Sequence, residues 1–317
     1  MSRNFWKNKK ILITGGHGFV GSHVVDFLLQ KQHVSRSQLV IPDSEKDDLR
    51  NPRQASRVVK GIDIILHLAA DVGGIGYSSS HPATQMRNCL QIDLHVLEAA
   101  ACEKVEKIVC VSSAVAYPAT AKSPLKEKDL FQGEPAKGGY GYGFAKRMAV
   151  VLSRAYHEEK GLNVAVLLAA NAYGPKDNFD PETSHVIPSL IRKCLTERKL
   201  VVWGDGSQIR DFLYVKDFAE AIILAAERLK THAPINVSSG ESVTIEQLVK
   251  SVVVLTGFKG EVYFDTSKPQ GQKMRTVDFK KAQKLMKFQP RFTLNQGLKE
   301  TIDWYLKYGQ KKSPKKT

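Results

Sequence analysis

The chain of 317 residues is 42% hydrophobic and carries 47 Lys and Arg against 32 Asp and Glu, a formal net charge of +15. No apolar run reaches the roughly 18–20 residues that a membrane span requires. The four cysteines form neither a Cys-x-x-Cys pair nor a metal-ligand pattern. We therefore expect a cytoplasmic protein with reduced thiols, no metal site and no membrane segment.

The positive charge has two interpretations. Basic proteins often bind nucleic acid, but four of the last seven residues are lysines and the other basic residues are scattered along the chain. An anionic substrate, such as a nucleotide diphosphate, also favours a basic cleft. We expect no nucleic-acid partner, and we expect residues 309–317 to form a basic, disordered tail.

The N-terminal half alternates apolar runs with helical patterns. The apolar runs predict strands at 11–13, 38–43, 61–70, 107–113 and 163–170. The segment 141–160 reads as a long helix that Gly161 ends. This alternation predicts an α/β fold, a Rossmann-type doubly wound parallel sheet with helices on both faces.

The pattern changes after Tyr173. The stretch "GPKDNFDPETSH" is a long polar loop of the kind that carries binding function, and the later elements are shorter and mixed. We expect a dinucleotide-binding domain at 1–174, rejoined by about 211–240. The segments 175–210 and 241–308 are expected to form a smaller mixed α/β substrate-binding domain.

Three glycines follow the first strand in a G-x-x-G-x-x-G pattern and precede a helix. Such a turn needs glycine for its backbone angles, for close approach of a pyrophosphate and for strand–helix packing, and the helix N-terminus attracts the anion. We predict NAD or NADP binding here. The candidate cofactor-binding residues are Gly15, Gly18, Phe19, Val20, Gly21 and, at the end of the third strand, Ala69.

The residues after the second strand leave the choice of cofactor open. Asp43 lies about 20 residues beyond the glycine loop, where an acidic residue can bind the ribose 2′-hydroxyl of NAD. Lys46 or Arg50 could instead contact the 2′-phosphate of NADP. A solvated charged loop without either role is the third interpretation.

Tyr142 and Lys146 form a Y-x-x-x-K pattern, which places both side chains on one helix face. A neighbouring ammonium group stabilises a phenolate, so the pair can move a proton near neutral pH. Ser113 ends the preceding strand, at the sheet edge where α/β folds place their sites. We predict Ser113, Tyr142 and Lys146 as catalytic, with Lys146 also binding the cofactor, whereas Tyr140 has Phe144 and not a lysine four residues on.

These residues, with "AADVGGIGYSSSHPA", "NAYGPKDNFDPETSHVIPSLIRK" and "VVWGDGSQIRDFLYVKD", resemble extended short-chain dehydrogenases/reductases that act on nucleotide sugars. The similarity is greatest to the GDP-L-fucose synthase family, and it covers nearly the whole chain. It implies hydride transfer at C4 and epimerisation at C3 and C5 of a GDP-linked 4-keto-6-deoxy sugar. It also implies a homodimer, with the helices near 89–103 and 147–160 as the candidate interface.

The resemblance also suggests further site residues. His185 matches the family's proton-transferring histidine, the alternative being a structural hydrogen bond in a loop. The positions that match the substrate region are Asn171, Arg192, Trp203, Arg210 and Arg275. Arginine can hold phosphate oxygens bidentately, although an ion pair with Asp205 or Asp211 is the plain alternative for Arg210.

Two positions depart from the family pattern. Val115 stands where the family has a cysteine, and an isopropyl group cannot move a proton as a thiol can. His17 stands where the family has the arginine that contacts NADP, which weakens the case for NADP without establishing NAD.

The reaction therefore stays open among full fucose-synthase chemistry, C4 reduction alone and 4-epimerisation with tightly held NAD. We expect epimerisation at C3 and C5 to be slow or absent because of Val115. A non-catalytic nucleotide-binding regulator on the same fold is the alternative from another functional class.

Overall fold

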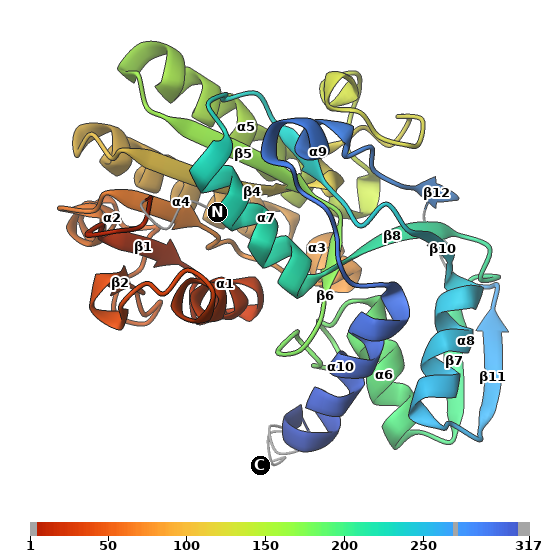
Figure 1. Ribbon diagram of the computed structural model, residues 1–317. Helices are drawn as coiled ribbons and strands as arrows, with labels where there is room; N and C mark the ends of the chain where they lie inside the picture. Colours follow the sequence, from red (N-terminus) through yellow and green to blue (C-terminus); the bar gives the residue numbers. More distant parts are fainter. Residues whose placement is uncertain (1–4, 269–271, 310–317) are drawn as a thin grey trace.

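The computed structural model describes residues 5–268 and 272–309. Apart from Gly309, the tail expected at 309–317 lies outside the described residues. Two lobes stand side by side, a larger one that contains the N-terminal half and a smaller one built mainly from later residues (Figure 1).

A parallel sheet forms the centre of the larger lobe. Its strand order is β2-β1-β3-β4-β5-β9. The strands are β1 Ile11–Thr14, β2 Leu39–Val40, β3 Ile64–His67, β4 Lys107–Ser113, β5 Val164–Ala169 and β9 Ile235–Val237. The chain runs from β1 to β2 on one side and then to β3 on the other, so a topological switch point lies between β1 and β3. Ligands of open α/β sheets bind beyond the carboxyl ends of the strands at such a point.

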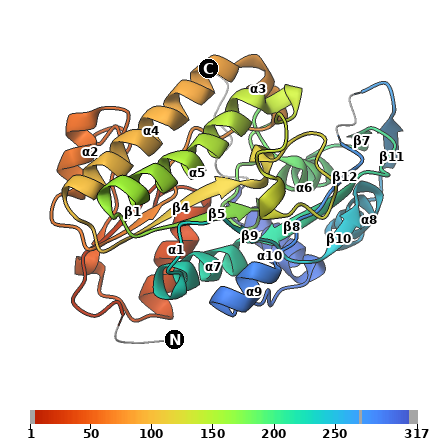
Figure 2. The same ribbon diagram turned by 90° about the horizontal axis from the view of Figure 1, so that it is seen from above.

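Helices cover both faces of this sheet (Figure 2). On one face lie α2 Pro52–Val59, α4 Pro82–Cys102 and α5 Tyr140–Lys160. On the other lie α1 Phe19–Gln30, α7 Val215–Arg228 and α9 Lys280–Met286. The predicted Rossmann-type fold with helices on both faces is confirmed.

The smaller lobe has its own apolar core, which includes Leu200, Phe212, Leu248 and Leu298. Its strands are β6 Asn171–Tyr173, β8 Ile209–Tyr214, β10 Ser242–Thr244 and β12 Met274–Arg275, with a separate pair β7 Lys199–Trp203 and β11 Glu261–Asp265. Its helices are α6 Val186–Thr196, α8 Ile245–Thr256 and α10 Leu294–Tyr308. Within the segment 211–240, β8 belongs to this lobe, whereas β9 pairs with β5 of the larger sheet.

Several predicted elements differ in their bounds. The strand expected at 38–43 is only β2, and the strand expected at 61–70 ends at His67. Helix α4 begins at Pro82, where a proline in the first turn has no N–H that must be paired. Helix α5 ends at Lys160, and its C-cap residue Gly161 has a positive φ of 68°, which suits a left-handed cap.

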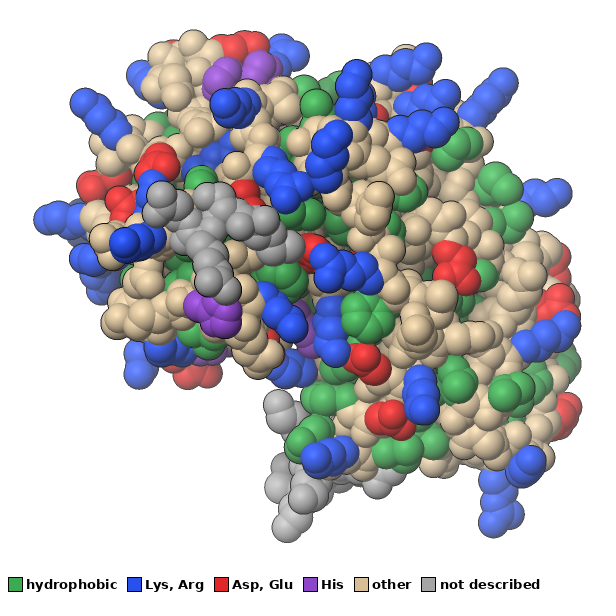
Figure 3. Space-filling model, viewed as in Figure 1, with side chains coloured by type: hydrophobic (Ala, Val, Ile, Leu, Met, Phe, Trp, Pro, Cys, Tyr) green, Lys and Arg blue, Asp and Glu red, His purple; other side chains and the backbone are tan. Residues whose placement is uncertain are grey.

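The visible surface carries Lys and Arg side chains on both lobes, with Asp and Glu side chains between them (Figure 3). They do not gather into one basic stripe on this face. Within residues 5–268 and 272–309, no helix is long and apolar enough to cross a membrane. The same residues contain no group of His, Cys, Asp and Glu that could hold a metal ion.

Candidate active site

The glycine loop joins β1 to α1 at the switch point of the sheet. Gly15 has a φ of +68°, and a Cβ atom on Gly21 would lie 2.1 Å from the Gly15 carbonyl oxygen. No side chain fits at either position, because the loop packs against the backbone after β3 and against the first turn of α1. Helix α1 begins after Gly18 without a side-chain cap, so Phe19 and Val20 present first-turn N–H groups to an anion.

The backbone of Ala69 packs against this loop. Its N–H donates a 3.1 Å hydrogen bond to the Thr14 hydroxyl, and its backbone nitrogen lies 3.0 Å from where a Gly15 Cβ would stand. The backbone just after β3 therefore contacts the glycine loop directly.

The charged side chains after β2 are largely engaged with one another. Asp43 Oδ1 accepts the N–H of Glu45 at 3.0 Å, and Arg50 holds Asp48 through Nε at 2.9 Å and Nη2 at 2.8 Å. These contacts leave the choice between NAD and NADP open.

Strand β4 and helix α5 position the Ser113, Tyr142 and Lys146 candidates. The Ser112 hydroxyl donates to the Lys146 carbonyl at 2.7 Å, and Lys146 Nζ donates to the Val111 carbonyl at 3.2 Å. The ammonium nitrogen lies 5.9 Å from the centre of the Tyr142 ring. Lys146 and Tyr142 thus share one face of α5, next to the end of β4.

Two glycines flank Tyr142 and allow α5 to approach its neighbours. A Cβ atom on Gly141 would lie 2.5 Å from the Pro82 carbonyl oxygen at the start of α4. A Cβ atom on Gly143 would lie 3.0 Å from the Val115 carbonyl oxygen and 2.6 Å from Pro135 Cβ. The first turns of α5 are therefore pressed between α4 and the turn after β4, which fixes the place of Tyr142.

Burial and charge act in opposite directions on Tyr142. Burial raises the pKa of its phenol to about 12, and the Lys146 ammonium group opposes this rise. For Lys146 itself burial lowers the pKa, but the negative charge of Asp93 and smaller contributions outweigh it, so the net pKa lies above the ordinary value. The surroundings of Lys146 therefore favour its ammonium form beside the tyrosine.

His185 and Val115 lie on two different segments. His185 is the N-cap residue of α6 and is exposed, and the protein atoms around its ring displace water and lower its pKa. The loop before it contacts the segment after β3, since the Gly74 N–H donates to the Thr183 carbonyl at 2.9 Å. Val115 lies in the short turn Ala114–Ala116, and its N–H donates to Ser113 Oγ at 3.3 Å.

Arg210 and Arg275 are neighbours on the parallel strands β8 and β12. Arg275 donates through Nη2 to the Ala114 carbonyl beside Val115, so the pair reaches the turn after β4. Burial lowers the pKa of both guanidinium groups, and Arg210 adds to this effect to bring that of Arg275 to about 10. In the described part of the chain Arg210 forms no ion pair, because Asp205 accepts from Ser207 and Asp211 from Ser238 and Ser239.

The other substrate-region candidates have different surroundings. Asn171 Nδ2 donates to the Asp211 carbonyl at 3.1 Å, and Arg192 Nη1 lies 3.2 Å from Glu197 Oε1. Trp203 is 53% exposed at the end of β7. The structure thus brings Arg210 and Arg275 together and engages Arg192 in an ion pair within the smaller lobe.

One buried polar cluster was not predicted from the sequence. Thr14, His67 and Asp93 are buried and hydrogen-bonded to one another between the glycine loop and α4. The available signal was a histidine inside the apolar strand "IILHLAA" and an aspartate inside the apolar helix "QIDLHVLEAA", both unusual in buried positions.

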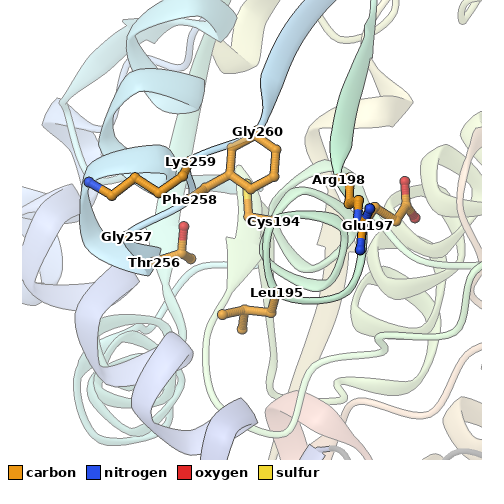
Figure 4. A pocket seen from close by; sticks show the side chains of 9 residues that line it. All are labelled: Cys194, Leu195, Glu197, Arg198, Thr256, Gly257, Phe258, Lys259 and Gly260. Carbon is orange, nitrogen blue, oxygen red and sulfur yellow. The ribbon is translucent and has the colours of Figure 1, made fainter.

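A hollow of about 550 Å³ lies elsewhere, between α6, α8 and the starts of β7 and β11 (Figure 4). Its side chains include Cys194, Arg198 and Lys259. Because Trp203 ends β7 and Arg198 precedes it, this hollow is at the opposite end of that strand from the candidate site.

The model of the NAD dependent epimerase/dehydratase family matches residues 11–238, a span that contains the glycine loop, Ser113, Tyr142 and Lys146. The chain belongs to this family. A probable GDP-L-fucose synthase 1 of Oryza sativa subsp. japonica is 34% identical over 308 residues, which is 95% of this chain and 93% of that protein.

Two solved structures are also similar to this family member. A GDP-6-OMe-4-keto-L-xylo-heptose reductase from C. jejuni superposes with a TM-score of 0.89 at 25% identity, over 97% of this chain and 99% of that one. A GDP-L-fucose synthetase from Naegleria fowleri bound to NADP gives 0.87 at 27% identity, over 96% and 94%. The predicted enzyme class and the predicted nicotinamide cofactor are confirmed at the level of the family, whereas the residue roles stay predictions.

Proposed function

We propose that this protein is an NAD(P)H-dependent reductase that acts at C4 of a GDP-linked 4-keto sugar and epimerises C3 and C5 slowly or not at all. The observation that carries the proposal is the Tyr142–Lys146 pair at the end of β4, with Val115 in the adjoining turn and two arginines behind it. The C. jejuni relative is a reductase of a GDP-linked 4-keto sugar, and the rice relative is a probable GDP-L-fucose synthase.

The residues of the glycine loop suit a dinucleotide. Side chains at Gly15 or Gly21 would clash with the backbone of Ala69 and of Gly15, so the glycines allow the loop to pack tightly, and the α1 N-terminus beside it has uncapped N–H groups. Phe19 and Val20 would bind the pyrophosphate through their backbone, and Lys146 would hydrogen-bond the nicotinamide ribose. A bound nicotinamide dinucleotide supplies the hydride.

Proton transfer is the task of Tyr142. As the C4 carbon gains hydride, the phenol gives its proton to the C4 oxygen, and the Lys146 ammonium group stabilises the resulting phenolate. Ser113 donates a hydrogen bond to the same oxygen and holds it near the phenol.

Arg210 and Arg275 together suit the diphosphate group of the substrate. Two guanidinium groups side by side repel each other, and a diphosphate between them removes this repulsion while accepting charge-assisted hydrogen bonds from both. Trp203 is exposed at the end of its strand, where it can contact the nucleotide.

Epimerisation needs one group to remove a proton from carbon and another to return it. His185 supplies one such group, but Val115 supplies none. We therefore assign C4 reduction, and not the full synthase reaction, to this chain. The homodimer through α4 and α5 and the cytoplasmic location stay predictions.

The test is incubation of the protein with GDP-4-keto-6-deoxymannose in deuterated water, first without and then with NADPH or NADH. Mass analysis of the sugar should show little deuterium at C3 and C5, followed by reduction once the reductant is added. Rapid deuterium uptake at both carbons would show that the protein epimerises C3 and C5, and would favour the full synthase reaction. No reaction in either stage would contradict the proposal, and a 4-epimerase assay on nucleotide sugars would then be next.

A further inference from the structure

A row of polar side chains crosses the larger sheet beneath α4 and α5. Thr14 on β1 is the register partner of His67 on β3, and His67 is the register partner of Cys110 on β4. Register partners point to the same face of a sheet. The row therefore runs from the residue before the glycine loop towards the strand that carries Ser113.

The hydrogen-bond partners of Thr14 and His67 fix the positions of their protons. The Thr14 hydroxyl oxygen accepts the N–H groups of Leu68 and Ala69, each at 3.1 Å, so both its lone pairs are used. Its own proton must then go to His67 Nδ1, which lies 2.7 Å away. His67 is therefore the neutral tautomer protonated on Nε2, and it donates to Asp93 Oδ1 at 3.0 Å.

The second oxygen of Asp93 is the unusual feature. Asp93 is 3% exposed, and in the described part of the chain its Oδ2 is buried without a hydrogen-bond partner. A buried carboxylate oxygen without a hydrogen-bond partner destabilises the folded protein unless a positive charge lies near it. Lys146 shows the same pattern with the opposite charge. It is 4% exposed, its hydrogen-bond acceptor is the neutral Val111 carbonyl, and among the described residues it forms no ion pair.

Several observations place these two charges near each other. Helices α4 and α5 run side by side over the sheet (Figure 2). Asp93 raises and Lys146 lowers the pKa of both the Cys89 and the Cys110 thiol, so both charges act on the same two groups. The groups that raise the pKa of Lys146 are Asp93, the first among them, then Tyr142 from its own helix, Cys89 from α4 and Cys110 from β4, and Asp93 is the carboxylate among them.

We propose that Asp93 is a positioning residue, which supplies the counter-charge that keeps Lys146 an ammonium ion beside Tyr142 and is itself fixed to the glycine loop through His67 and Thr14. Its consequence for turnover rests on the proposed function, whereas the charge of Lys146 can be measured without any substrate. Loop, acid and lysine are thus parts of one hydrogen-bonded and electrostatic unit.

The direct test is the titration of Lys146 by NMR in protein labelled at the lysine side chains, with Lys146→Met to assign the signal. In the wild-type protein Lys146 should stay protonated beyond the ordinary lysine value of about 10.4. Asp93→Asn keeps an acceptor for His67 but removes the charge, and it should lower the pKa of Lys146 by about 1–3 units. A wild-type value below the ordinary one, which burial alone would produce, overturns the proposal even if the variant fails to fold.

Asp217→Asn is the matched control. Asp217 is an equally buried carboxylate, which accepts the N–H groups of Arg291 and Phe292 far from Lys146 in the sequence. This variant should lose stability without moving the Lys146 titration. An equal shift in both variants, or no shift in Asp93→Asn, would reduce Asp93 to a structural role.

Turnover gives the second readout. In Asp93→Asn the alkaline limb of the kcat profile should move to lower pH, and Asp93→Glu, which restores the charge, should recover most of that shift. If the wild-type protein reduces no nucleotide sugar, the proposed function fails while the titration still decides the role of Asp93. If the wild-type protein reduces its substrate and Asp93→Asn does not change the Lys146 titration, the proposed function stands and Asp93 is not the counter-charge of Lys146.

Discussion

The hydroxyl of Ser112 donates a 2.7 Å hydrogen bond to the backbone carbonyl of Lys146, which joins the end of β4 to the second turn of α5. Ser113 follows at the carboxyl end of the strand, and Tyr142 lies one helical turn before Lys146. A contact outside the predicted triad therefore sets the register between its strand residue and its helix residues.

Tyr142→Phe is expected to reduce hydride transfer about 100- to 10,000-fold, the usual contribution of a positioned proton donor. Cofactor affinity should stay close to that of the wild-type protein, because Lys146 and the glycine loop are intact. Steady-state kinetics and cofactor titration provide the measurement. Tyr140→Phe is the control, since Tyr140 is 48% exposed on the same helix and should tolerate the change. Near-normal turnover in Tyr142→Phe would remove it from the proton path.

Arg210→Ala should weaken GDP-sugar binding by roughly 1.5–3 kcal/mol, the range for hydrogen bonds to charged groups. Dinucleotide affinity should hardly change, because the glycine loop lies on the other lobe. Isothermal titration with GDP and with NADPH separates the two effects. Arg154→Ala, which removes an exposed arginine paired with Glu158 on α5, should change neither affinity. Equal losses for both ligands in Arg210→Ala would indicate a structural role.

Gly141→Ala is expected to destabilise the protein by about 1–3 kcal/mol, as overpacking does. The added Cβ would lie 2.5 Å from a backbone oxygen of α4, so the start of α5 must move and carry Tyr142 with it. Turnover should therefore fall together with the denaturation midpoint. Gly76→Ala is the matched change, because its Cβ would approach nothing closer than 3.9 Å. It should be neutral or stabilising by up to about 1 kcal/mol.

Sequence reasoning succeeded where the signal is local. The glycine spacing, the Y-x-x-x-K pattern and the Gly161 cap are contained in short segments, so α1, β4 and α5 were predictable. It failed where partners lie far apart in the chain, since Thr14 and His67 are 53 residues apart and His67 and Asp93 are 26 apart. The sheet register brings Thr14 beside His67, and the packing of α4 on the sheet brings Asp93 to His67. The use of the Asp43 carboxylate as a turn acceptor was equally invisible, because it depends on the local backbone path.

The buried side chain of Lys107 should make the free energy of unfolding depend on pH. The residue is 2% exposed, donates to Asn163 Oδ1 and the Leu229 carbonyl, and burial lowers its pKa to about 8. Because the folded value is below the unfolded one, the unfolded state binds more protons and stability rises with pH across this window. The free energy of unfolding should gain about 2 kcal/mol from this residue between pH 7 and 9.5.

The measurement is urea denaturation at several pH values for the wild-type protein and for Lys107→Met, which has a similar shape and no charge. Other groups titrate in both proteins, so the difference between the two slopes isolates Lys107. Identical slopes would show that the ammonium group is hydrated in the folded state, and that burial does not penalise its charge.

Val115→Cys provides the sharpest test of the assigned reaction. The residue lies in the turn that follows Ser113, and its carbonyl packs against Gly143 next to Tyr142. A thiol at this place is a proton donor and acceptor that valine is not, and it complements His185 from a second segment. Valine and cysteine differ little in volume, so the fold should tolerate the change.

We expect Val115→Cys to take up deuterium at C3 or C5 of GDP-4-keto-6-deoxymannose at least tenfold faster than the wild-type protein, while C4 reduction changes little. Val115→Ala controls for the added space, because it removes bulk without adding an acid, and it should show no such gain. A second control, Val115→Cys with His185→Gln, should lose the gain because proton exchange at carbon again lacks one partner. Rapid uptake in the wild-type protein, or equal gains in the alanine and cysteine variants, would mean that the residue at position 115 does not limit epimerisation.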